Sequence, residues 1–422
     1  MQSDVSLTQA LFWGLVACIS LTGRVSAFPG RLLNPRADGP VDSIVRSWSY
    51  GIPSQVQNGT AHARFTIPTA GSKLETTALL TLDSPQVRSI NSSVFDWWYF
   101  DAVSETDPRE SLALIFFTST AAAFPWLPPN ETSVLVAYIW ASFANGTVFA
   151  DYLHATIARV AGGEGANPPS SGNWSSTGCS WTAPKDDLSQ YEVIVSSKEM
   201  QVEGRLSLSS ELGPHLPCSI QPGTTTLEIA PHMGWVALKP DAVGQVDITV
   251  RGSSLSFQGP AYHDKNWSDR PFEESVQSWY WGHGHIGPYS VVWFSYLAVD
   301  DPSHMAYVSG YVARNGAVLV SSCNSTLLSV RPTGAFGTSA RYPPRAGDVP
   351  DGFHLEFDLG DTGWLRANVS GTVVAGDGKY YVRWAGKMAG EVVQSGGKPG
   401  YDAATQSQLH GSAVFEQFVV AA

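Results

Sequence analysis

Short apolar runs, each bounded by glycine, proline, asparagine or serine, follow one another from residue 61 towards the end of the chain. Most have the length of a strand, and we expect residues 77–82 (TALLTL) to be one of them. The run over residues 134–143 meets the next run at Asn145-Gly146, which predicts a hairpin with a type I′ turn. Arg-Asn-Gly and Gly-Asp-Gly turns recur later, and no heptad or extended helical stripe is present. The sequence therefore predicts an all-β protein of antiparallel strands.

The length of 422 residues is large for a single β-barrel. We therefore expect two β-domains side by side. The polar, glycine- and proline-containing region around residues 230–244 is the best candidate for the boundary. It gives an N-terminal domain over residues 28–240 and a C-terminal domain over residues 241–422.

The N-terminus has the pattern of a secretory signal. An apolar run over residues 11–21, too short to span a bilayer, is followed by the small residues Val25-Ser26-Ala27. A buried N-terminal helix is the alternative, but it explains the small-residue boundary less well. We expect residues 1–27 to be a signal peptide, and no later run has the length of a membrane span. The expected location is therefore the secretory pathway, in the lumen or outside the cell. Separately, the net charge of −12 argues against binding to the phosphate backbone of nucleic acids.

Cysteines and glycosylation motifs agree with an oxidising compartment. Cys179 and Cys218 both lie in stretches rich in serine, proline and glycine, so we expect them to form a disulfide and Cys323 to be free. Three unpaired buried thiols are the alternative. Eight Asn-x-Ser/Thr triplets are present, and Asn266 is expected to be unmodified because it lies among aromatic residues. The expected glycosylation sites are Asn58, Asn91, Asn130, Asn145, Asn173, Asn324 and Asn368.

Three segments combine large aromatic residues with ionisable ones: residues 95–101 (FDWWYFD), 259–267 (GPAYHDKNW) and 278–289 (SWYWGHGHIGPY). The two-residue period of a strand places Trp97, Tyr99 and Asp101 on one face of the first segment, opposite to Asp96 and Trp98. Aromatic walls with a few polar groups are typical of a ligand pocket, although each segment alone also fits an aromatic core. With 43% hydrophobic and only 15% charged residues, the chain favours an apolar ligand. Together the segments predict a pocket.

The ionisable residues of these segments leave several chemistries open. His263 and Asp264 could form an acid/base couple with Tyr262 as a donor, but neighbours on a regular strand face opposite ways, so this needs a bulge. Asp101, or Asp96, could serve as an acid if aromatic neighbours raise its pKa. His283 and His285, with His263 or Asp264, could bind a metal, but packing histidines are the stronger interpretation, and we predict no metal.

Two sequence motifs of other enzyme classes do not apply to this chain. Residues 282–287 match the dinucleotide-binding pattern G-x-G-x-x-G, but a strand follows them instead of the required helix. The nucleophile motif G-x-S-x-G is not present in the sequence.

At these residues the sequence resembles the fungal Diels-Alderases of polyketide biosynthesis, which are related to hydroxyneurosporene synthase-like and lipocalin-like proteins. The matching segments are FDWWYFDAV, PHMGW, GPAYHDKNW, SWYWGHGHIGPYSVVWF and, more loosely, the strands around residues 381–387. One departure is Ser268, which stands where such proteins usually have glycine. The resemblance implies an N-terminal sandwich-like domain, a C-terminal lipocalin-like barrel, a substrate cavity at their interface, and no cofactor.

The resemblance also implies a reaction. A rigid aromatic cavity folds a polyene or other hydrophobic, polyketide-derived substrate for a [4+2] cycloaddition, and a hydrogen bond to a substrate carbonyl lowers the barrier further. Similar proteins that act as hetero-Diels-Alderases, hydratases or epoxide-rearrangement isomerases would need an acid. A lipocalin-like carrier of a hydrophobic metabolite is a further alternative. The sequence does not indicate an oligomeric state. The expected catalytic residues are Asp101, Tyr262, His263 and Asp264, and the expected substrate-binding residues are Trp98, Tyr99, Asn266, Trp267, Trp281, His283 and Trp293.

Overall fold

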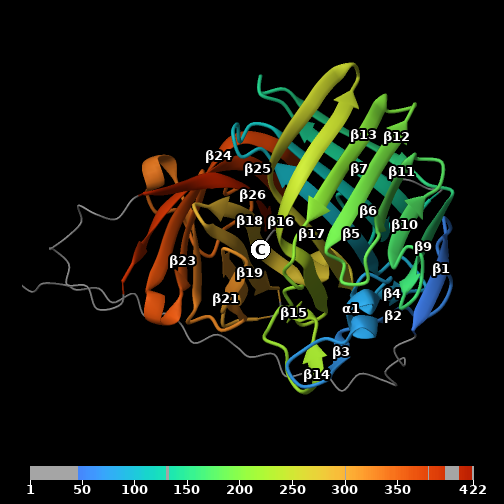
Figure 1. Ribbon diagram of the computed structural model, residues 1–422, viewed down its shortest axis with the longest axis horizontal. Coiled ribbons are helices and arrows are strands. Elements are labelled where there is room, and N and C mark those ends of the chain that lie inside the picture. The colour runs from blue at the N-terminus through green and yellow to red at the C-terminus, as the bar shows by residue number, and fades with distance from the viewer. Residues whose placement is uncertain (1–45, 130–132, 300, 379, 395–407, 421–422) are drawn as a thin grey trace, which may run out of the picture.

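Two large antiparallel sheets make up most of the protein, which is described from a computed structural model (Figure 1). The structure describes residues 46–129, 133–299, 301–378, 380–394 and 408–420. The expected signal peptide and Asn130 lie outside these residues. No helix in the described part of the chain is long and apolar enough to cross a membrane.

The larger sheet has 13 strands and contains most of the N-terminal half. Its strands, in spatial order, are β1 (Ser47–Pro53), β9 (Ile157–Gly163), β10 (Ser170–Trp174), β11 (Cys179–Ala183), β12 (Gln190–Ser197), β13 (Val202–Ser209), β16 (Met233–Val250), β17 (Ser253–Ser268), β5 (Phe95–Val103), β6 (Ser111–Ser119), β7 (Leu135–Ser142) and β8 (Val148–His154), with β15 (Glu228–Ala230) beside β16.

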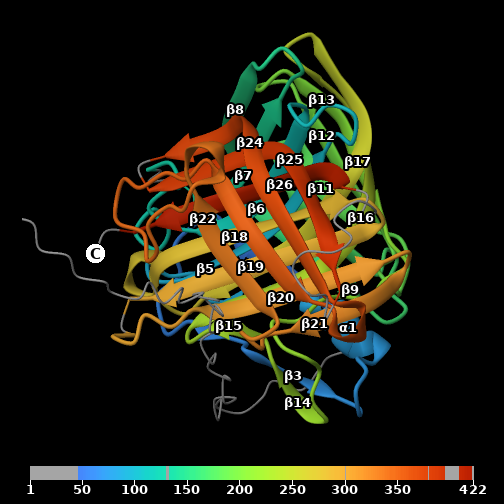
Figure 2. The ribbon, with the colours of Figure 1, turned by 90° about the vertical axis from the view of Figure 1, so that its left-hand side faces the viewer.

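The smaller sheet has nine strands from the C-terminal half (Figure 2). In spatial order these are β21 (Ala317–Ser322), β20 (Tyr307–Arg314), β19 (Tyr289–Ala298), β18 (Val276–Ile286), β26 (Leu409–Val419), β25 (Tyr381–Val393), β24 (Trp364–Gly378), β23 (Gly352–Asp358) and β22 (Leu328–Thr333). The remaining elements are the pairs β14 (Gly223–Thr226) with β3 (Thr66–Thr69) and β2 (His62–Ala63) with β4 (Val87–Arg88), the helix α1 (Thr76–Leu82), and the 3-10 turns Phe272–Glu274, Ala335–Gly337 and Gly360–Thr362.

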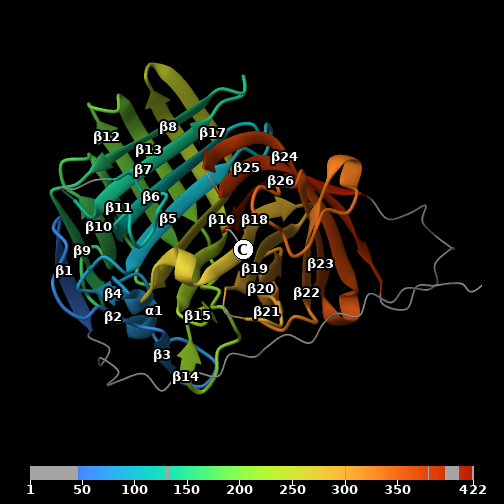
Figure 3. The same ribbon diagram turned by 180° about the vertical axis from the view of Figure 1, so that it is seen from behind.

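The buried apolar side chains form three clusters that follow from the alternation of the strands. One cluster fills the inside of the larger sheet around Trp98 and Trp181, and another fills the inside of the smaller sheet around Trp293 and Phe353. The third lies between the sheets, with Trp97 on one side and Trp279 on the other. Seen from behind, β5 and β17 of the larger sheet lie next to β18 and β26 of the smaller one (Figure 3). The expected all-β fold with two β-rich halves is confirmed.

Residues 77–82, which we expected to be a strand, belong to helix α1. Ala78, Leu80 and Leu82 of this helix are buried against the core of the larger sheet. Alanine and leucine favour helix, and tertiary packing decides the conformation of such a short apolar run. The strand prediction was therefore wrong at this position.

The Asn145-Gly146 hairpin joins β7 to β8 as expected, but its turn differs from type I′. Only Gly146 has a positive φ, of 83°, and its N–H donates to the carbonyl of Phe143 at 2.8 Å. This pattern fits a type I turn followed by a left-handed glycine, a common longer hairpin loop. The two-residue turn with positive φ at both positions occurs instead at Asn315-Gly316, between β20 and β21.

The expected domain boundary at residue 240 falls inside β16, a continuous strand of 18 residues. Both β16 and β17 pair within the larger sheet, whereas β18 pairs within the smaller one. We therefore place the division of the chain between Ser268 and Val276. Its physical reason is the pairing of β17 with β5, which keeps residues 253–268 in the N-terminal half.

The disulfide joins Cys218 to Cys323, so the expected Cys179–Cys218 pair was wrong. Cys179 begins β11 with its side chain in the core of the larger sheet, and burial raises the pKa of its thiol to about 11. Cys218 follows a segment that crosses to the smaller sheet. There His215 makes hydrogen bonds of 2.8 Å to the hydroxyls of both Ser309 and Ser321. The disulfide, with a sequence separation of 105 residues, therefore links the two halves.

Candidate active site

A cavity of about 470 Å³ lies in the layer between the two sheets. This volume lies within the range of small-molecule sites. Large aromatic side chains form much of its wall, and its acidic and basic lining residues come from β17, β24, β25 and β26. The aromatic lining residues are Trp97, Tyr99, Phe117, Phe124, Trp126, Tyr138, Trp140, Trp279, Trp281, Tyr381 and Phe418.

Successive residues of strand β5 lie on opposite faces of the larger sheet, as the sequence predicts. Trp97 and Tyr99 line the cavity, while Trp98 belongs to the core of the larger sheet. Trp98 Nε1 donates to the carbonyl of Asp83 at 2.9 Å, so its polar atom is already engaged there. The expected substrate-binding role of Trp98 is therefore corrected to packing behind the cavity wall.

Strand β17 alternates in the same way, without a bulge against β5 over the residues concerned. Asp264 and Asn266 line the cavity. His263 stacks on Phe100 with ring centroids 3.9 Å apart, and Trp267 Nε1 donates to the carbonyl of Arg64 at 2.7 Å. His263 and Trp267 thus point away from the cavity. The expected His263–Asp264 couple cannot form because neighbouring strand residues face opposite sides.

Asp264 is the carboxyl group in the cavity wall that carries a strongly shifted pKa. Burial raises this pKa to about 8, and the nearby carboxylates of Glu416 and Asp101 add to the rise. Trp235 Nε1 at 2.9 Å and the Tyr262 hydroxyl at 3.0 Å both donate to Oδ2, which opposes the rise only in part. Within the described residues Oδ1 accepts no hydrogen bond, so it is the oxygen left to carry a proton. A pKa of about 8 leaves Asp264 mainly in its protonated form at neutral pH.

An ion pair in the cavity wall joins two residues from the last strands. Arg383 Nη2 lies 2.7 Å from Glu416 Oε2, and the Tyr381 hydroxyl donates to the same oxygen at 2.8 Å. The guanidinium carbon of Arg383 lies 4.7 Å from the ring centroid of Tyr99, so the pair reaches across to the larger sheet. A paired carboxylate thus shares the cavity with the protonated Asp264.

Asp101 and His283 meet beneath the cavity. His283 Nε2 lies 2.7 Å from Asp101 Oδ1, and the hydroxyl of Tyr99 donates to Asp101 Oδ2. The ring of His283 stacks on that of Tyr262 at 4.7 Å. The structure therefore brings Asp101, Tyr262 and His283 together behind the lining residues rather than in the lining itself.

Trp281 lines the cavity as expected, whereas Trp293 does not. Trp293 lies in the core inside the smaller sheet, on the opposite face of the strands, and is fully buried there. The expected role of Trp293 as a wall residue is corrected by this placement. His285 lies 3.4 Å from Asp241, and no group of three metal-ligating side chains occurs among the residues that were placed.

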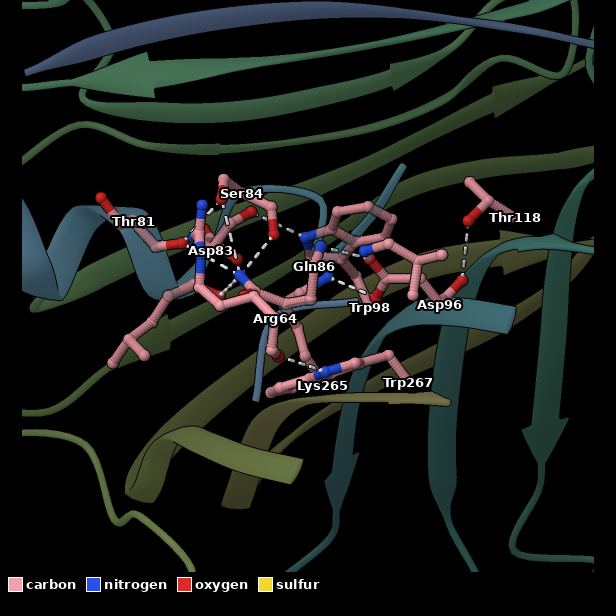
Figure 4. A network of polar contacts seen from close by, with 12 residues as sticks. Arg64, Thr81, Asp83, Ser84, Gln86, Asp96, Trp98, Thr118, Lys265 and Trp267 are labelled. Atoms are coloured by element: carbon pink, nitrogen blue, oxygen red, sulfur yellow. Dashed lines mark hydrogen bonds and ion pairs between the residues drawn. The ribbon is translucent and has the colours of Figure 1, made fainter. Parts of the chain in front are cut away.

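A buried polar network lies on the other side of β5 and β17 (Figure 4). Lys265 Nζ lies 2.7 Å from Asp96 Oδ1, and both side chains are fully buried. The backbone N–H of Gln86 donates to Asp96 Oδ2 at 2.6 Å. Lys265 Nζ also lies 3.2 Å from the centroid of the Trp98 ring. This network fixes the strands whose opposite face forms the cavity wall.

Arg383, Glu416 and Tyr381 were not among the expected site residues. Apolar side chains recur at every second residue along parts of β25 and β26. Arg383 lies on the same face of β25 as the buried Tyr381, and Glu416 lies on the same face of β26 as the buried Phe418. A single charge on the apolar face of a strand is costly unless it is paired or functional. That pattern is the signal by which the sequence could have indicated them.

The comparisons with known proteins agree with this architecture. The sequence profile of the family described as Diels-Alderase-like matches residues 61–342. The quinolone epoxide rearrangement protein asqO of Emericella nidulans is 34% identical over 295 residues, which cover 68% of this chain and 76% of that protein. The quinolone epoxide rearrangement protein penF of Penicillium thymicola is 33% identical over 344 residues, covering 80% and 88%.

The fold has a solved counterpart. The crystal structure of CghA with Sch210972 superposes with a TM-score of 0.66 at 17% identity, covering 88% of this chain and 99% of that one. At this identity the likeness concerns the fold alone. The profile match, the two relatives above 30% identity and the aromatic cavity between two β-sheets lead to one assignment: the chain is an enzyme of the Diels-Alderase-like family, of the cyclase or isomerase kind.

Proposed function

We propose that the protein is an acid-assisted isomerase that rearranges an epoxide of a small, flat, largely hydrophobic secondary metabolite, with Asp264 as the acid. The observation that carries the proposal is the position of Asp264 in an aromatic cavity, with a pKa raised to about 8 by burial. A general acid works best when its pKa lies near the working pH. The two relatives named as quinolone epoxide rearrangement proteins support the choice of an epoxide.

The reaction is balanced without an oxidant or a reductant. The proton on Asp264 passes to the epoxide oxygen as one C–O bond breaks. A neighbouring hydrogen or carbon group then migrates with its electron pair to the electron-poor carbon. The protonated carbonyl that results returns its proton to the Asp264 carboxylate, so substrate and product are isomers.

The cavity is suited to the positive charge that develops during such a step. Trp97, Tyr99 and Trp281 line the same cavity as Asp264, and aromatic faces attract cations. Glu416 also lines the cavity, but its ion pair with Arg383 leaves no net charge at that part of the wall. The aromatic groups therefore favour the cation-like transition state over the neutral substrate.

The pH dependence of turnover tests the proposal. The substrate is obtained as the precursor that accumulates when the gene is deleted in its native host, and it has the same mass as the lost product if the protein is an isomerase. With the purified protein, we expect kcat/KM to be constant below about pH 7 and to fall about tenfold per pH unit above about pH 8, because the acid loses its proton. A rate that stays flat through pH 8, or a precursor that differs in mass by one water, would contradict it.

A [4+2] cycloaddition is the second candidate, and the family name supports it. Shape catalysis of this kind needs the aromatic walls to fold the substrate, but no proton transfer. It predicts the flat pH profile that the first candidate excludes. A carrier of a hydrophobic metabolite would bind the precursor and leave it unchanged.

We further infer that the protein folds in the secretory pathway. The Cys218–Cys323 disulfide supports an oxidising compartment. The side chains of five of the expected glycosylation sites, Asn58, Asn145, Asn173, Asn324 and Asn368, are exposed, and Asn91 is half-buried. Asn266 is 2% exposed, in keeping with the expectation that it is unmodified. Glycosylation of the exposed sites stays a prediction.

A further inference from the structure

A fully buried histidine outside the cavity joins the two halves of the chain. His215 lies in the segment between β13 and β14, and its backbone N–H and carbonyl pair with those of Ala237 in β16 at 2.8 and 3.0 Å. Its ring reaches the smaller sheet, where it meets the hydroxyls of Ser309 and Ser321, each at 2.8 Å. The disulfide at Cys218 follows on the same segment. This segment is therefore fastened to both sheets.

The hydrogen bonds of the His215 ring define which nitrogen carries the proton. Burial lowers the pKa of His215 to about 3, so the ring is neutral at physiological pH. Ser309 has one hydroxyl proton, which it donates to the carbonyl of Pro217 at 2.7 Å. Nε2 of His215 must therefore donate to Ser309, and Nδ1 accepts from Ser321. Burial also raises the pKa of the neighbouring Tyr311, so this phenol carries no charge either.

The ring of His215 packs against the tryptophan that donates to Asp264. The ring centroids of His215 and Trp235 are 5.4 Å apart, with an interplanar angle of 82°, which is a T-shaped contact. Phe294 of the smaller sheet makes a second T-shaped contact with Trp235 at 5.2 Å. Nε1 of the indole reaches Asp264 Oδ2 at 2.9 Å. A continuous chain of contacts thus runs from His215 through Trp235 to Asp264.

The hydrogen bond from Trp235 affects both the geometry and the acidity of Asp264. Oδ2 accepts from Trp235 and from Tyr262, which leaves Oδ1 to carry the proton. Burial, with Glu416 and Asp101, raises the pKa of this carboxyl group, whereas the two donors favour its charged form and lower the pKa. An indole that moves away would therefore leave a weaker acid with one fewer bond to fix its orientation.

We propose that His215 is a positioning residue for Asp264, because it holds the indole of Trp235 in the orientation from which Nε1 donates to the carboxyl group. A buried histidine that does not line the cavity thereby acquires a part in the reaction. The proposal rests on the proposed function for the role of Asp264 as the acid. The hydrogen bond itself can be measured separately from turnover.

The C=O stretch of protonated Asp264 tests the proposal. Infrared difference spectra at about pH 6, between each protein and its Asp264→Asn counterpart, isolate this band. Trp235→Phe removes a donor to Oδ2 and should raise the frequency, because a hydrogen bond to a carbonyl oxygen weakens the C=O bond. His215→Ala should raise it in the same direction, since the indole loses its support. An unchanged frequency in His215→Ala would overturn the proposal.

The pH profile of turnover gives a second readout. In Trp235→Phe and His215→Ala the pH above which kcat/KM falls should rise by about one unit, the effect of one lost hydrogen bond to the carboxylate. At pH 7 kcat should fall about threefold to thirtyfold, because a weaker acid transfers its proton less readily. KM should change little, since neither residue lines the cavity. A profile of His215→Ala that coincides with that of the wild type would contradict the proposal.

Leu355→Ala is the matched control for a general loss of stability. Leu355 is fully buried in the cluster inside the smaller sheet, whereas Trp235 belongs to the cluster between the sheets. The control should lower the unfolding midpoint and leave both the C=O frequency and the pH profile unchanged. The same shifts in Leu355→Ala as in His215→Ala would show a general effect of destabilisation and count against positioning.

A double variant identifies the route by which His215 acts. In the Trp235→Phe background, His215→Ala should add no further shift of the frequency or of the pH profile. Additive shifts would show a different route, such as the backbone pairing with Ala237, and would overturn the proposal. A wild type without the protonated band contradicts the proposed function itself, whereas a band that His215→Ala leaves unchanged contradicts this inference alone.

Discussion

Replacement of Asp264 by Asn is expected to lower turnover of the accumulated precursor by about 10² to 10⁴, the usual contribution of a general acid. The amide keeps the size of the side chain, and its carbonyl oxygen can still accept from Trp235 and Tyr262. The cavity should therefore keep its shape and KM should change little. The measurement is kcat and KM for product formation by the purified variant.

The control for this variant is Asp247→Asn. Asp247 is an exposed carboxylate of β16, and its replacement should leave kcat and KM as in the wild type. An Asp264→Asn enzyme with kcat within about threefold of the wild type would remove Asp264 from the mechanism. Such a result would instead favour catalysis by shape alone.

The same substitution should change how stability depends on pH. The folded pKa of Asp264 is raised from 3.8 to about 8, so the folded state holds this proton where the unfolded state has lost it. The stabilisation of the protonated form is thus fully present below about pH 4 and is lost as the pH rises through about 8. In Asp264→Asn this contribution to the decline between pH 4 and 8 should be absent.

Replacement of Lys265 by Met is expected to lower the free energy of unfolding by about 3 to 5 kcal/mol. The substitution leaves Asp96 buried without its cation, and both side chains are fully buried in the wild type. Burial raises the pKa of Asp96 and lowers that of Lys265, and the ion pair opposes both shifts. Denaturant unfolding measured by tryptophan fluorescence gives the change.

A second variant shows whether the loss comes from the unpaired charge. In Lys265→Met with Asp96→Asn the buried charge is gone, and the Asn oxygen can still accept from the backbone N–H of Gln86. This double variant should recover a large part of the stability lost by Lys265→Met alone. Equal or greater loss in the double variant would contradict an electrostatic origin.

Much of the fold and a smaller part of the cavity wall could be predicted from local patterns. Strand alternation correctly separated Trp97 and Tyr99 from Trp98, because a period of two is a property of the backbone itself. The same rule, applied strictly to residues 262–267, would have excluded His263 and Trp267 from the site. The resemblance to known proteins grouped the residues of this segment together, whereas the sheet divides them between two faces.

The remaining features depend on contacts between distant parts of the chain. Cys218 pairs with Cys323 because the segment after β13 crosses to the smaller sheet, which local composition around Cys179 could not reveal. Arg383 and Glu416 meet through the register of β25 with β26, far from the aromatic motifs in sequence. Helix α1 forms where local propensity is ambiguous and packing decides.

The protonation state of Asp264 decides whether this residue can act as the acid. Infrared difference spectra of the wild type and Asp264→Asn isolate the C=O stretch of a protonated carboxyl group at this position. We expect this band at about pH 6 and its loss as the pH passes through about 8. A carboxylate signal from Asp264 already at about pH 6, with no protonated band, would contradict the assignment of Asp264 as the acid.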